Sequence, residues 1–151
     1  MRLFLSLFVA LTFTASSALA SDHHHHGEQQ TLQMNKDKQW QTDATLRNNM
    51  SSLADTLRTK TKAIHKGELG AAEYAALGAA VDTSVGDIVK NCKLPADADA
   101  MLHIVIGELI AAAETMRGKA DANKAGAAHQ AVVALNNYGK YFNHPGWVPI
   151  Q

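Results

Sequence analysis

The sequence contains one cysteine, Cys92, and its thiol is the first side chain to consider for chemistry. Thiolate, thioether and imidazole are soft or borderline ligands that favour Cu(I) or a haem iron, and Met50 and His103 supply the other two. Each residue also has a structural interpretation: Met50 as a core filler, Cys92 as a small buried side chain, and His103 as a helix residue bonded to a carbonyl. We expect a metal site formed by Met50, Cys92 and His103.

A second group of donors is a run of four histidines near the start of the chain. A chain cleaved after residue 20 begins Ser-Asp-His, and its amine, two amides and imidazole form the square-planar nitrogen set suited to Cu(II) or Ni(II). A histidine-rich segment is itself a metal-binding composition. The alternative is an expression tag, although a tag rarely sits immediately after a leader. The expected Cu(II) ligands are His23, His24, His25 and His26.

The first 20 residues have the pattern of a secretory leader. Arg2 precedes a mostly apolar run over residues 3–11, and Ala-Leu-Ala stands before Ser21. The leader predicts export to the periplasm, an oxidising compartment in which one cysteine cannot form an internal disulfide. Cys92 is therefore a free thiol, a metal ligand or a link between the two chains of a homodimer.

The numbers of basic and acidic residues are equal, which bears on the kind of partner the protein binds. The chain has 14 Lys and Arg against 14 Asp and Glu, so loss of Arg2 leaves a net charge near −1 with the histidines neutral. This balance gives no electrostatic reason to expect a nucleic acid or an anionic membrane. After the leader, no apolar stretch approaches the roughly 20 residues that span a bilayer. The expected partners are a metal ion and a periplasmic protein that receives the metal or an electron.

Four segments with apolar residues at helical spacing must position these side chains. The expected helices cover residues 43–66, 71–92, 97–117 and 121–143. Helices of about 20 residues with short connections must lie antiparallel to their neighbours. We therefore predict an all-α, up-down-up-down four-helix bundle over residues 40–147. Residues 21–38 are polar and lack a period, which predicts a flexible arm.

The predicted topology brings distant segments to one end of the bundle. The side chains that meet there are Met50, Cys92, His103, Tyr141 and His144. His65 and His129 fall near the opposite end and could meet there. Histidines at helix termini are more simply explained by capping and helix-dipole interactions, so we leave this pair out of the predicted site.

The sequence lacks the motifs of the common hydrolytic and phosphate-binding sites. It has no Gly-x-Ser-x-Gly, no His-Glu-x-x-His, no phosphate loop and no plausible catalytic triad on adjacent helical faces. We expect no enzymatic activity. A Cys-x-x-Cys-His motif is also missing, so any haem would be held non-covalently.

Residues 47–55 read Arg-Asn-Asn-Met-Ser-Ser-Leu-Ala-Asp, which resembles the first helix of the cytochrome b562 family. In that family this helix carries the axial methionine, and Met50 matches it. The family's axial histidine lies late in the last helix, where this chain has Gly139. The resemblance implies a four-helix bundle and a b-type haem, for which His103 or His144 would have to replace the missing ligand.

Three further stretches are similar to small secreted bacterial proteins described as DnrO-like. They lie at residues 40–47, 91–103 and 141–146, and the second contains Cys92 and His103. This resemblance implies a histidine-rich leader segment, a cytochrome b562-type bundle and metal or redox activity in the periplasm.

Three functions follow from these observations. The first is periplasmic copper binding, with the histidine run taking Cu(II) and Met50, Cys92 and His103 taking Cu(I). The second is electron transfer by a haem held between Met50 and His103. The third is a cofactor-free interaction or stress module in which Cys92 forms a crosslink.

Overall fold

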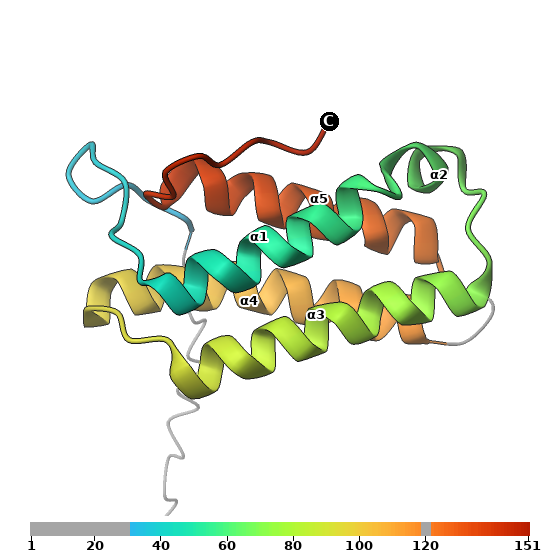
Figure 1. The fold of residues 1–151 in the computed structure, drawn as a ribbon, viewed down its shortest axis with the longest axis horizontal. Coiled ribbons are helices and arrows are strands. Elements are labelled where there is room, and N and C mark those ends of the chain that lie inside the picture. The colour runs from blue at the N-terminus through green and yellow to red at the C-terminus, as the bar shows by residue number, and fades with distance from the viewer. Residues whose placement is uncertain (1–30, 119–121) are drawn as a thin grey trace, which may run out of the picture.

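The computed structural model describes residues 31–118 and 122–151. These residues form a helical bundle, and the part of the chain that is described contains no strand. The elements are α1 (Ala44–Arg58), α2 (Thr61–Lys66), α3 (Ala71–Asn91), α4 (Ala96–Arg117) and α5 (Lys124–Tyr141). Figure 1 shows the four long helices running lengthwise, with α2 as a short turn of helix beyond α1. The all-α prediction is confirmed.

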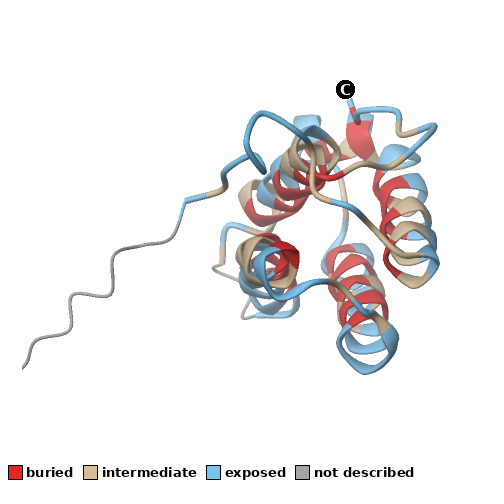
Figure 2. Ribbon diagram, turned by 90° about the vertical axis from the view of Figure 1, so that its left-hand side faces the viewer, coloured by how far each residue is buried: buried red, intermediate tan, exposed pale blue. Residues whose placement is uncertain are grey.

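The packing of the long helices follows their apolar stripes. α3 packs on both α1 and α4, α4 packs on α5, and α5 closes the ring against α1. Viewed along the bundle in Figure 2, the buried faces of the helices point toward one another and the exposed faces point outward. The buried stripe of α1 contains Leu46, Met50, Leu53 and Leu57, as the helical spacing predicts. Hydrophobic burial along these stripes is therefore the main source of stability.

The single helix predicted over residues 43–66 is wrong, because the chain breaks after Arg58 and restarts at Thr61. The hydroxyl of Thr59 donates to the carbonyl of Thr56, and the hydroxyl of Thr61 donates to that of Leu57. The N–H of Lys60 also bonds the carbonyl of Leu57, only three residues back, so the chain closes here with a tighter turn than within the helices. The break lets α2 turn away from α1 and pack on α5.

The chain on either side of the bundle is also packed against it. Asn35 and Lys38 exchange two backbone hydrogen bonds in a tight turn, so residues 31–38 hold part of the arm in a defined conformation. After α5, the side chain of Asn136 bonds both the N–H and the carbonyl of Ile150, which is buried. The packed part of the chain thus extends beyond the predicted boundary at residue 147.

No described helix has the length and apolar character needed to cross a bilayer.

Candidate functional site

The segment before α1 is bonded to the segment after α5, and together they build one end of the bundle. The N–H of Trp40 donates to the carbonyl of Tyr141 over 2.9 Å, and the N–H of Asn143 donates to the carbonyl of Trp40 over 2.8 Å. The hydroxyl of Thr42 donates to the carbonyl of Asn143 over 2.6 Å. We call the region formed by residues 31–43, the last turn of α3, the first turns of α4 and residues 142–144 the arm end.

Asp43 holds three parts of the arm end together. One of its carboxylate oxygens accepts the N–H of Leu46 at 2.7 Å, which caps α1. The other accepts the N–H of Lys93 at 2.7 Å, directly after α3. The Cys92 thiol donates to the same carboxylate over 3.6 Å. Burial alone would raise the pKa of Asp43, but these hydrogen bonds and the charge of Arg47 lower it below its usual range.

Cys92 occupies a structural position in this arrangement. Its side chain is half-buried and packs against the core, as expected for a small apolar residue. Burial, followed by the negative charge of Asp43, raises the pKa of the thiol to about 12. The thiolate is the form that attacks disulfides and binds metals. At neutral pH Cys92 is thus a protonated hydrogen-bond donor, poorly prepared for a disulfide or for ligation.

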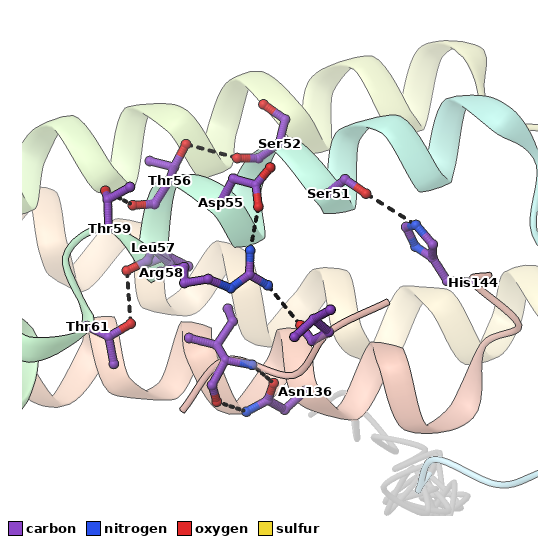
Figure 3. Close-up of polar contacts among 12 residues, drawn as sticks. Ser51, Ser52, Asp55, Thr56, Leu57, Arg58, Thr59, Thr61, Asn136 and His144 are labelled. Atoms are coloured by element: carbon purple, nitrogen blue, oxygen red, sulfur yellow. Dashed lines mark hydrogen bonds and ion pairs between the residues drawn. The ribbon is translucent and has the colours of Figure 1, made fainter. Parts of the chain in front are cut away.

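His144 links the C-terminal segment to α1 and α5. Its Nδ1 lies 2.9 Å from the Tyr138 hydroxyl. Its Nε2 lies 3.2 Å from the Ser51 hydroxyl, and Figure 3 shows this contact. Burial, followed by the charge of Arg47, lowers the pKa of His144, while burial raises the pKa of Tyr138. A neutral imidazole with both nitrogens bonded to protein hydroxyls has no free lone pair for a metal.

Gly139 stands where the resemblance to the cytochrome places the axial histidine. The side chain of Trp147, which follows α5, occupies the space beside it. A Cβ on Gly139 would lie 2.0 Å from Nε1 of Trp147, so the indole packs directly on the backbone of α5. Tyr138 and Phe142 stack beside it, with ring centroids 5.4 Å apart. Aromatic side chains therefore occupy this end of the core, and the residues present do not fit a haem bound by the family's scheme.

Met50 and His103 lie in opposite environments. Met50 is 0% exposed in the core stripe of α1, whereas the His103 side chain is 66% exposed on α4. Nδ1 of His103 lies 2.8 Å from the carbonyl of Asp99, one turn earlier on the same helix. The structure thus matches the structural interpretation of each residue, and it does not bring Met50, Cys92 and His103 into one ligand set. It likewise offers no pair of axial ligands from Met50 and His103.

Two other methionines do share a pocket at the arm end. Met34, which is 38% exposed, and Met101, which is half-buried on α4, line a cavity of about 450 Å³. Thr31, Trp40 and Asp97 also line it. The indole N–H of Trp40 donates to the carbonyl of Gln33 over 2.7 Å, which holds the segment that carries Met34. Sequence reasoning missed this pair because Met34 lies in the segment assigned to the flexible arm.

The predicted Cu(II) ligands His23, His24, His25 and His26 lie outside the described residues. Within residues 31–118 and 122–151, no group of three or more His, Cys, Asp and Glu side chains is arranged to hold a metal ion. Methionine is not among these ligand types, so this absence does not bear on the pocket lined by Met34 and Met101. Comparisons with family models, with curated proteins and with solved structures give no match to this chain, and the two resemblances noted in the sequence remain predictions.

Proposed function

We propose that this protein is a periplasmic copper-binding protein without enzymatic activity. In this proposal His23–His26 bind Cu(II), and the pocket with Met34 and Met101 binds Cu(I). The observation that carries it is that these two thioethers, from the segment before α1 and from α4, line one solvent-open pocket at the point where the described chain begins. The proposal therefore assigns Cu(I) to Met34 and Met101 instead of Met50, Cys92 and His103.

The chemistry of the pocket suits a soft monovalent cation. Thioethers are ligands that select Cu(I), and the face of an indole attracts a nearby cation. Trp40 lines the pocket together with the two methionines, and its charged lining residues are Asp97, which is negative, and Lys36, which is positive. The remaining methionines of the bundle, Met50 and Met116, are 0% exposed and are not accessible to an ion from solvent.

The spacing along the chain keeps the histidines close to this pocket. Only four residues separate His26 from Thr31, which itself lines the pocket. A fully extended chain covers at most about 3.6 Å per residue, so His26 stays within roughly 18 Å of Thr31. An ion captured by the histidines would reach the methionines after a short transfer. We propose that the four long helices follow the up-down-up-down topology and act as the scaffold.

A titration of the mature chain with copper tests both parts of the proposal. The combined variant Met34→Leu and Met101→Leu should lower the Cu(I) affinity at least tenfold in a competition assay, because leucine keeps the apolar volume and removes the sulfur. The matched control Met50→Leu should leave the affinity unchanged, since that side chain is in the core. Replacing all four histidines of the run by asparagine should remove the Cu(II) bound by the run and leave Cu(I) binding intact.

Two results would overturn the proposal. Equal Cu(I) affinity in the parent and the double methionine variant would show that the pocket is only a packing feature. Unchanged Cu(II) binding after replacement of the histidines would show that the run is only part of the leader region.

A further inference from the structure

Two histidines that are distant in the sequence meet at the end of the bundle opposite the arm end. His65 lies near the end of α2, and His129 lies in the second turn of α5. The centroids of their rings are 5.7 Å apart, and the ring planes are tilted by 60°. Both residues are exposed. Figure 1 shows α2 over the first half of α5, which is the packing that brings them together.

The spacing of the rings matches that of two imidazoles on one ion. An imidazole nitrogen binds Zn(II) at about 2.0–2.1 Å, so two rings that share an ion with bond angles near tetrahedral have centroids roughly 5–6 Å apart. The observed separation of 5.7 Å lies in this range. Both side chains are exposed, so neither ring is held in its present orientation by burial in the core.

The ring nitrogens of His65 and His129 have no bonding partner in the part of the chain that is described. Neither His65 nor His129 makes a hydrogen bond or an ion pair there. By contrast, His103 bonds the carbonyl of Asp99, and His144 bonds two hydroxyls. A capping role would require a contact between an imidazole and a helix-terminal carbonyl, and the described residues show none for this pair. Their lone pairs are therefore available to a ligand.

We propose that His65 and His129 form a surface site for a divalent transition metal such as Zn(II) or Cu(II), with water completing the coordination. The site joins α2 to α5 and so fixes the short helix that follows the break after α1. It rests on described residues alone and does not depend on the copper proposal for the arm end. Imidazole suits Zn(II) and Cu(II), and no third His, Cys, Asp or Glu ligand lies within reach in the described structure.

Thermal unfolding in the presence of Zn(II) distinguishes this site from the histidine run. A ligand raises stability only when it binds the folded chain more tightly than the unfolded chain. His65 and His129 come together only in the folded protein, whereas four consecutive histidines bind metal whether or not the bundle is folded. Zn(II) is redox-inert and does not oxidise Cys92, and loss of the Tm rise in His65→Gln and His129→Gln assigns the rise to the α2–α5 site.

The experiment uses the full mature chain in which His23–His26 are replaced by asparagine, compared with the parent. Saturating Zn(II) should raise Tm by several degrees in both chains. His65→Gln and His129→Gln should each remove the rise without changing the Tm of the metal-free protein, because both side chains are exposed. The matched control His103→Gln should keep the full rise, and calorimetric titration should find one Zn(II) per chain that is lost in either variant.

The site would be overturned by either of two results. Zn(II) could fail to raise Tm in the chain that lacks the histidine run, or the rise could persist in that chain after His65→Gln or His129→Gln. Because the histidine run is absent from the tested chain, a failure here leaves the copper proposal untouched, and a failure of the copper titration leaves this site untouched.

Discussion

The two ends of the bundle differ in how their polar side chains are used. At the arm end, hydrogen bonds join segments about a hundred residues apart, such as the side chain of Gln39 with the carbonyl of Gly139. Cys92 bonds Asp43, which lies 49 residues earlier, and His144 contacts Ser51, which lies 93 residues earlier. At the opposite end, His65 and His129 face each other with no such contact in the described chain. Side chains predicted to do chemistry are used for folding at the arm end, and a histidine pair is left available at the other.

The contact between Trp147 and Gly139 gives the largest expected effect. Gly139→Ala places a Cβ against the indole, and because the ring is packed between Tyr138 and the helix, the C-terminal segment must shift. Overpacking typically costs about 1–3 kcal/mol, which should exceed the gain in helix propensity. Chemical denaturation followed by tryptophan fluorescence measures the loss.

The control for this variant is Gly86→Ala on α3, where nothing lies within 4 Å of the added Cβ. This change should stabilise the protein by up to about 1 kcal/mol, because alanine is the better helix former. Equal effects of the two substitutions would contradict the packing of Trp147 on α5, and with it the argument that this end of the core has no room for a haem.

The bonds to Asp43 should come next in size. Asp43→Ala removes the cap of α1 and leaves the N–H of Lys93 without its acceptor, so we expect a loss of about 1–2 kcal/mol in urea denaturation. Asp43→Asn keeps a side-chain oxygen for the cap and should lose less. At the opposite end, Glu73→Ala removes two exposed contacts, to Lys60 and to the N–H of Gly70, and should lose less still. If Glu73→Ala lost more unfolding free energy than Asp43→Ala, the claim that polar contacts stabilise the arm end more than the opposite end would be wrong.

The titration of His144 gives the smallest expected effect. Burial and Arg47 lower the pKa of His144 in the folded protein below its ordinary value of 6.5, so the unfolded chain binds the proton more readily. Its contribution to stability is complete above pH 6.5 and is lost as the pH falls through and below that value. His144→Gln should flatten this part of the profile of unfolding free energy against pH. An unchanged profile would show that His144 does not titrate differently in the folded state.

The sequence predicted the helical class and the core because periodic burial is a local property of each segment. Leu46, Met50, Leu53 and Leu57 fall on one stripe by spacing alone, and the structure buries all four. The break after Arg58 was not predicted, since the apolar stripe continues to Ile64 through the break. A tighter turn of the backbone leaves this pattern of apolar residues unchanged.

The candidate site was harder to predict because it depends on contacts between segments. Spacing places Met50 on the buried stripe of α1 and His103 near the same end of the bundle, but it does not show which side chains come into contact there. The partner of Cys92 is Asp43, which also caps α1, and the two residues are 49 positions apart in the sequence. The meeting of His65 with His129 depends on the break that turns α2 onto α5. None of these pairings has a sequence motif.

X-ray absorption at the copper edge of the mature, Cu(I)-loaded protein tests the central claim most directly, because it reports the atoms bound to the metal. We predict sulfur neighbours in the parent and in Met50→Leu, and their loss in the combined Met34→Leu and Met101→Leu variant. Sulfur neighbours that persist in the double variant and disappear in Met50→Leu or Cys92→Ala would contradict the account.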